Sequence, residues 1–193
     1  HGSALADGNI AIGTNALLGG AFGSSDLDLL GNVAIGYQAL DATAATAQTG
    51  NVAIGYQAAT ALNHADASGT IAIGYQAGLA VTQGQFNTIV GYQALKAQVS
   101  GDESTAIGYQ ALKSCTGTSG ETGNTAIGYK ACEDLTTGSA NIAIGSGAMK
   151  TTTTGGENIC IGKNTMVDVD AGSTSLASGA NIFIGTNAGS GTW

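Results

Sequence analysis

A nine-residue motif close to Asn-x-Ala-Ile-Gly-Tyr-Gln-Ala-Leu recurs ten times along the 193 residues of this chain. Its glycines are Gly13, Gly36, Gly55, Gly74, Gly91, Gly108, Gly128, Gly145, Gly162 and Gly185. Successive glycines lie from 17 residues (Gly145 to Gly162) to 23 residues (Gly13 to Gly36) apart, with the extra residues between motifs. Such repetition is typical of stacked structural units that contact only their neighbours. We therefore predict one elongated repeat domain over residues 4–193.

The three residues before each motif glycine predict a short β-strand. The motif lacks an apolar 3.6-residue period and contains glycine, and both features disfavour a helix. In Val33-Ala34-Ile35 the two outer side chains share one face of the strand and Ala34 points the other way. We expect a bend at Gly36, because glycine supplies the backbone freedom for it. Ala39 and Leu40 would then form a second short strand that folds back onto the same interior as the isoleucines.

Each repeat should therefore form one coil, and the fold class is an all-β parallel β-roll or β-solenoid. About ten coils with ladders about 4.8 Å apart would give a rod of about 50 Å. The small residues on the second strand face would pack against neighbouring chains or against the other sheet of the same coil. The motif asparagines would stack as an amide ladder or cap the turn into the strand. The inward core ladder is predicted to consist of Ile12, Ile35, Ile54, Ile73, Val90, Ile107, Ile127, Ile144, Ile161 and Ile184.

Composition excludes several functional classes. The net charge is −8, with only five lysines and arginines, so a nucleic-acid-binding surface is not expected. No stretch reaches the ~18 apolar residues of a membrane span, and no signal peptide is recognisable. Proline is absent, which suits a fold in which nearly every backbone N–H joins a ladder. Residues 1–3 look like the remnant of a tag, and the rest like a fragment of a longer fibrous protein.

Aromatic residues provide the main candidate binding site. All six tyrosines directly follow a motif glycine, and five of them are followed by glutamine. Stacked coils would align these side chains as a flat aromatic and amide strip that could contact a ligand such as a sugar. Alternatively, tyrosine shields the corner of each coil and glutamine solvates it. The candidate ligand-binding residues are Tyr37, Tyr56, Tyr75, Tyr92, Tyr109, Tyr129, Gln38, Gln57, Gln76, Gln93 and Gln110.

Other chemistry-bearing residues do not combine into a recognisable site. The pairs Asp26 with Asp28 and Asp168 with Asp170 occupy the two longest connectors, but they lack the spacing of a calcium-binding β-roll, so solvated acids are expected. His64 and Asp66 fall in one insertion, which contains no third residue to complete a metal-binding or catalytic group with them. Buried thiols are expected at Cys132 and Cys160, which replace the motif leucine and alanine, whereas Cys115 lies in a connector. No nucleophile motif, phosphate loop or catalytic carboxylate pair is present. We therefore expect no catalytic site, no metal and no cofactor.

The repeats GNVAIGYQAL (31–40) and GNTAIGYKAC (123–132) resemble the β-roll repeats in the heads of trimeric autotransporter adhesins. They also resemble repeat regions of bacteriophage tail fibres. The resemblance covers about residues 8–190 and implies a left-handed roll, a homotrimer around one axis, and a structural or attachment role without a catalytic site. Two departures matter. The adhesin-head coil is shorter, and the stalk, neck, anchor and chaperone segments of those families are not present in these residues.

Three functional hypotheses follow. The first is a stiff trimeric segment of a phage tail fibre that spaces or forms the receptor-binding region, located on the virion. The second is the head of a bacterial surface adhesin that binds a glycan or matrix protein on a host cell, with the insertions 19–31 and 168–180 as contact loops. The third is an ice- or mineral-binding lattice, which the threonine run 151–154 suggests, although threonine does not recur at one position of every coil.

Overall fold

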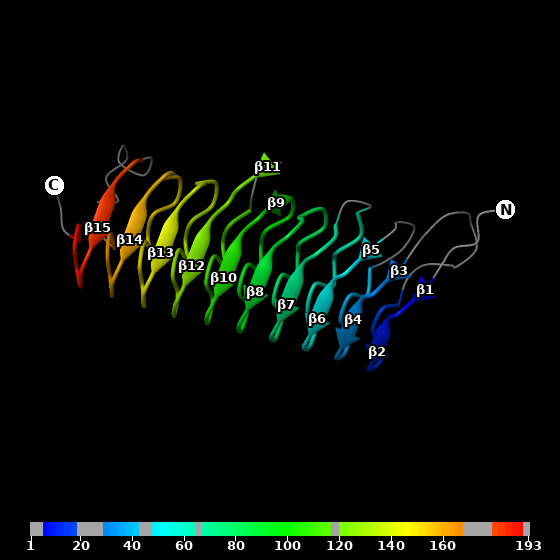
Figure 1. Ribbon diagram of the computed structural model, residues 1–193. Coiled ribbons are helices and arrows are strands. Elements are labelled where there is room, and N and C mark those ends of the chain that lie inside the picture. The colour runs from blue at the N-terminus through cyan, green and yellow to red at the C-terminus, as the bar shows by residue number, and fades with distance from the viewer. Residues whose placement is uncertain are drawn as a thin grey trace.

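A computed structural model describes residues 6–18, 29–42, 48–64, 67–116, 120–167 and 179–190. Strands and turns make up these residues, and none of them is helical. The repeats lie side by side in chain order and form an elongated molecule, with the first described repeat at one end and the last at the other (Figure 1). The prediction of an all-β parallel solenoid is confirmed.

One long parallel sheet runs the length of the molecule and contains one strand from each repeat. Neighbouring strands pair motif on motif, so that Ala106 aligns with Ala126 and Ile107 with Ile127. The sequence repeat therefore sets the register of the sheet. The strands are β2 (Ile10–Ile12), β4 (Val33–Ile35), β6 (Val52–Ile54), β7 (Ile71–Ile73), β8 (Thr88–Val90), β10 (Thr105–Ile107), β12 (Thr125–Ile127), β13 (Ile142–Ile144), β14 (Ile159–Ile161) and β15 (Ile182–Ile184).

The remaining strands are two-residue pieces in the connectors, shortly before a motif strand. One set is β1 (Ala6–Asp7), β3 (Leu29–Leu30) and β5 (Gln48–Thr49), and the other is β9 (Gly101–Asp102) and β11 (Gly120–Glu121). Both sets pair in parallel. The second strand predicted directly after the motif glycine is wrong, because the described residues at that point form turns.

The corner after each strand is built from alternating left-handed residues. In one copy, φ is +137° at Gly55, +53° at Gln57 and +47° at Ala59. Gln57 donates its N–H to the carbonyl of Tyr37 in the preceding coil (2.8 Å), and Ala59 donates to Ala77 in the following coil (2.9 Å). The chain thus turns tightly while its N–H groups still bond the neighbouring coils, which satisfies the backbone without a strand.

The interior is filled by small residues of the strand and by the residues of the corner. Ala34, Ala39 and Leu40 are fully buried, and their counterparts in the other central coils are equally buried. Val33 and Ile35 on either side of Ala34 are only half-buried, and this alternation recurs from β6 to β14. The small face is therefore the inner face. The sequence left open whether the small residues pack against neighbouring chains or within their own chain, and the structure shows packing within the chain.

The predicted inward isoleucine ladder is therefore wrong in its direction. Each coil has a thin interior, and the corner leucine with its alanine already fills most of it. Only a small strand side chain fits in the remaining space, and strand alternation then turns both neighbours outward. The side chains that form a ladder on the outside are Ile12, Ile35, Ile54, Ile73, Val90, Ile107, Ile127, Ile144, Ile161 and Ile184.

Two exceptions to the small inward residue show how limited the interior volume is. Ile89 replaces the usual alanine, and a Cβ at Gly78 would lie 2.8 Å from its Cδ1 atom. Gly78 stands where four of the ten copies have a leucine, so the missing side chain makes room for the isoleucine. Phe183 and Gly189 form the same kind of pair, with 2.5 Å between the Phe183 Cδ1 atom and a Cβ at Gly189. The total interior volume stays nearly constant, as core packing requires.

The motif asparagines form a buried amide ladder that also holds the connectors. Asn124 Oδ1 accepts hydrogen bonds from the backbone N–H (3.0 Å) and the Nδ2 (3.1 Å) of Asn141. Asn141 Nδ2 also donates to the carbonyl of Gly155 (2.8 Å). The asparagines therefore combine the two predicted roles of an amide ladder and a cap. Each side chain can hydrogen-bond the neighbouring coil and also the connector that follows it. Thr70 and Ser104 occupy this position in two coils.

Candidate binding surfaces

The outward face of the long sheet is an exposed, largely apolar surface. Ile142 and Ile144, in the interior of the sheet, are 37% and 36% exposed. The first outward position of each strand is also β-branched in every copy, so the face holds two such side chains per strand. These first positions are Ile10, Val33, Val52, Ile71, Thr88, Thr105, Thr125, Ile142, Ile159 and Ile182.

No charged residue occurs at any outward position of the ten strands, although the chain carries a net charge of −8. With strands about 4.8 Å apart and two side chains about 7 Å apart on each, the face covers on the order of 300 Å². Apolar patches of a few hundred Å² are often functional surfaces, and this one is interrupted only by the threonines Thr88, Thr105 and Thr125. The sheet face is thus a candidate site, although its isoleucines were predicted from the sequence to lie in the core. The signal that could have located it was the alanine between two large residues.

The six tyrosines form one continuous stack along the solenoid. Adjacent ring centroids are 5.0 to 5.3 Å apart and the ring planes differ by 8 to 15°. Each tyrosine is between 40% and 55% exposed. The predicted alignment of Tyr37, Tyr56, Tyr75, Tyr92, Tyr109 and Tyr129 is therefore what the structure shows. The stack ends on both sides because the residue that follows the motif glycine is Thr14 in the coil before it and Ser146 in the coil after it.

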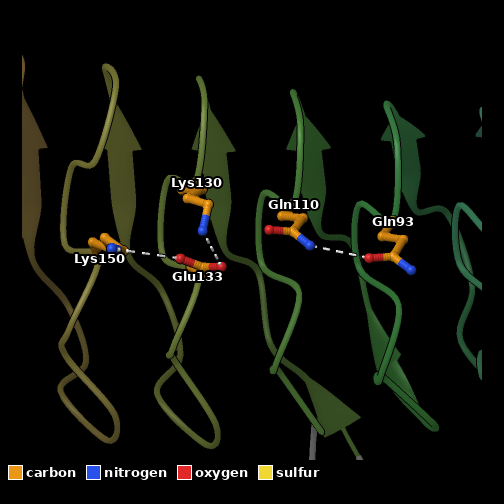
Figure 2. A network of polar contacts seen from close by, with 5 residues as sticks. All are labelled: Gln93, Gln110, Lys130, Glu133 and Lys150. Atoms are coloured by element: carbon orange, nitrogen blue, oxygen red, sulfur yellow. Dashed lines mark hydrogen bonds and ion pairs between the residues drawn. The ribbon is translucent and has the colours of Figure 1, made fainter.

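The glutamines beside the stack form a parallel ladder of amides. Each Nε2 donates to the Oε1 of the preceding glutamine, at 2.9 Å from Gln57 to Gln38 and at 3.0 Å from Gln76 to Gln57. The ladder continues through Gln93 to Gln110, again at 3.0 Å per step (Figure 2). Every internal glutamine uses one N–H and one oxygen lone pair in the ladder, so one of each remains.

The amide ladder ends in a small ionic cluster. Lys130 takes the glutamine position and pairs with Glu133 at 2.9 Å, and Lys150 approaches the other Glu133 oxygen at 3.8 Å (Figure 2). The hydrogen bond to Glu133 raises the pKa of Lys130, with smaller contributions from nearby charge. The Lys130 ammonium also lies 5.7 Å from the centre of the Tyr129 ring. The tyrosines and glutamines are therefore neutral over five coils, and the ladder ends at the charged Lys130.

The stacked geometry determines what the tyrosines can bind. Each internal ring has a neighbouring ring over both of its faces, so a ligand cannot stack flat on it. The exposed parts are the ring edges and the phenol hydroxyls, each of which can donate and accept a hydrogen bond. Among the described residues, none of the six hydroxyls has a hydrogen-bond partner. The strip can thus contact a ligand through a row of evenly spaced hydroxyl groups.

The core is rich in sulfur toward its C-terminal end. Cys132 and Cys160 are buried, as expected from their apolar motif positions, and Cys115 in a connector is buried as well. Cys160 Sγ lies 3.6 Å from Met166 Sδ. Burial raises the pKa of Cys160 to about 11, and it raises the pKa of Cys132 still further, with smaller contributions from the neighbouring thiols. These protonated thiols are poor nucleophiles, and they pack as apolar side chains.

We expect stability to fall in alkaline solution because of these two thiols. Above the ordinary thiol pKa of about 8.5, the unfolded chain loses their protons while the folded chain keeps them, so the free energy of unfolding decreases. The decrease should be about 1.4 kcal/mol per thiol per pH unit, and for Cys160 it ends near its folded pKa of about 11. Denaturant titrations at several pH values measure it. The Cys132→Leu/Cys160→Ala variant, which restores the common motif residues, should lose this dependence, and an unchanged slope would contradict the assignment.

The remaining candidates do not form sites among the described residues. No group of three or more His, Cys, Asp or Glu side chains able to hold a metal occurs within the described part of the chain. Asp26, Asp28, Asp168, Asp170 and Asp66 lie outside it, as do most of the insertions 19–31 and 168–180. In the run 151–154, Thr152 is buried and the others are not, so the run forms no even array. No described helix could cross a membrane.

Comparisons with known protein families, with curated proteins and with solved structures find no match to this chain.

Proposed function

We propose that this chain is a structural and attachment module of a trimeric fibre, a phage tail-fibre segment that spaces or forms the receptor-binding region of a virion. In this proposal each of the ten motif copies belongs to one complete coil of a left-handed roll. Three rolls lie parallel around one axis and contact each other through the outward face of the long sheet. The likeness of the repeats to fibre and adhesin-head repeats supports the trimeric state.

The observation that carries the proposal is the uncharged face of twenty β-branched side chains. A second copy of the chain fits this face best, because it presents the same row at the same coil spacing over the same length. Contacts can then repeat from coil to coil, and closed symmetry limits assembly to a defined particle. The core of each roll lies within one chain. Assembly would therefore add stiffness and remove apolar surface from water.

Two alternatives rest on particular observations. The unpartnered tyrosine hydroxyls favour a role as an adhesin head that binds a glycan or matrix protein, on a phage or on a bacterial surface. The even, two-column array on the outward face favours ice or mineral binding, with Thr88, Thr105 and Thr125 as its polar part. A thermal-hysteresis measurement on the purified protein distinguishes the lattice alternative from the other two.

The solution mass tests the proposal directly. Light scattering on a sizing column should give close to three times 18.8 kDa. Ile107→Asp should shift the mass toward that of one chain, because it places three like charges around the axis without altering the interior. Its circular dichroism should stay unchanged. Gln83→Asp adds the same charge on an exposed connector residue and should keep the trimer. A monomeric wild type, or a trimer that tolerates Ile107→Asp, would overturn the proposed interface.

A further inference from the structure

The spacing between successive rings of the tyrosine stack can be compared with the repeat length of a polymeric ligand. Its ring centroids advance by 5.0 to 5.3 Å from coil to coil. That step is close to the length of one sugar in an extended chain of equatorially linked pyranose rings. A glycan of this kind lying along the solenoid would stay in register with the stack over all six coils. Each sugar would then meet one tyrosine hydroxyl.

The available groups match the edge of such a sugar chain. Sugar hydroxyls both donate and accept hydrogen bonds, as the tyrosine hydroxyls do. The adjoining glutamines each keep one N–H and one oxygen lone pair beyond those used in their ladder. Because the ring faces are covered by each other, a planar aromatic ligand gains little from this surface, whereas a row of hydroxyl groups gains one contact per coil.

Charge narrows the class of glycan further. The tyrosines and glutamines of the strip are uncharged from Tyr37 to Gln110, and Lys130 at the next step is already paired with Glu133. The position that Glu133 takes in its coil holds Asp41, Lys96 and Lys113 in other coils, so the charges beside the strip are few and of mixed sign. The chain as a whole has a charge of −8, which disfavours a polyanion at long range. A neutral polysaccharide therefore fits better than an acidic one. Each contact is weak and solvent-exposed, so useful affinity requires many contacts along one polymer.

We propose that the stack from Tyr37 to Tyr129, with its glutamine ladder, is a track for a neutral linear glycan of equatorially linked pyranoses, bound at one sugar per coil. The inference rests on the attachment role proposed above for its biological meaning. It does not depend on the trimer. The track gives that role a class of ligand, and it places the contact on the side of the rod rather than in the loops.

Calorimetric titration with β-1,4-linked gluco-oligosaccharides, from disaccharide to octasaccharide, tests the track. Affinity should rise with each added sugar and level off at the hexasaccharide, because the stack has six tyrosines. The α-1,4-linked series serves as a control, since its axial linkages curl the chain out of register, and it should bind much more weakly. Tyr75→Phe/Tyr92→Phe keeps the rings stacked but removes two hydroxyls, and it should weaken the hexasaccharide by about tenfold.

The chain also offers a variant that should extend the track. Ser146 is exposed and follows Gly145 in the position that tyrosine takes in the preceding coil. Ser146→Tyr should therefore move the plateau from the hexasaccharide to the heptasaccharide. No measurable binding, an affinity independent of length, or full binding by the double phenylalanine variant would overturn the track. A trimeric mass with no glycan binding leaves the fibre module standing, whereas a monomer that binds in the expected way leaves only the track.

Discussion

Replacing Gly128 with alanine should lower the free energy of unfolding by about 4 kcal/mol or more, from backbone strain and overpacking together. At Gly128 φ is +138°, a value that side chains of L residues rarely adopt. A Cβ there would lie 2.5 Å from the carbonyl oxygen of Gly145 and 2.7 Å from its carbonyl carbon. Both atoms belong to the backbone of the next coil. The coils can avoid the methyl group only by separating, which would break the ladder.

Thermal and denaturant unfolding followed by circular dichroism measures this loss. Gly123→Ala is the matched control, because Gly123 also has positive φ (+51°) but has nothing within 4 Å of an added Cβ. It should cost only about 1 kcal/mol, the usual penalty of a left-handed residue. If the two variants are equally stable, close approach of neighbouring coils is not the reason for the motif glycine.

Replacing Ala106 with aspartate should also lower the free energy of unfolding strongly. Ala106 is fully buried between Ile89 and Ala126 of the neighbouring strands. No described cation lies in that part of the interior, so the carboxylate would be buried without a partner, at a cost of about 3 kcal/mol or more. The change would also add volume to an interior that accepts a larger residue at Ile89 only beside Gly78.

Ile107→Asp is the adjacent control for this variant. The same charge one residue later lies on the outer face, so it should change the mass and leave the secondary structure intact. Circular dichroism at equal protein concentration compares the two. If Ile107→Asp unfolds the chain and Ala106→Asp does not, the inner and outer faces of the sheet have been assigned the wrong way round.

The repeat determined the long-range order of the fold because identical units stack most favourably in register. The solenoid, the parallel ladders, the asparagine ladder and the stack at Tyr37 and its equivalents all follow from position within the motif. The burial of Cys132 and Cys160 follows in the same way, since each replaces an apolar motif residue. These features depend only on which residues recur at which spacing.

The conformation of the corner could not be predicted from the repeat. The corner after Gly55 was expected to lead into a strand, but Gln57 and Ala59 adopt left-handed φ and form a turn. Most sequences avoid that conformation, so propensity gives no warning of it. It is favoured here because the alternating N–H groups reach the coils on both sides.

The sequence by itself determined that two faces of each strand differ, one with small residues and one with β-branched residues. Only the tertiary structure decided which face lies inside. Hydrophobicity alone favours burying Ile107, but the volume enclosed by one coil is limited, and the corner residues already occupy it. Packing volume therefore prevailed over apolar area, and Ala106 went inside. The isoleucine row that sequence reasoning assigned to the core became the surface on which assembly is proposed.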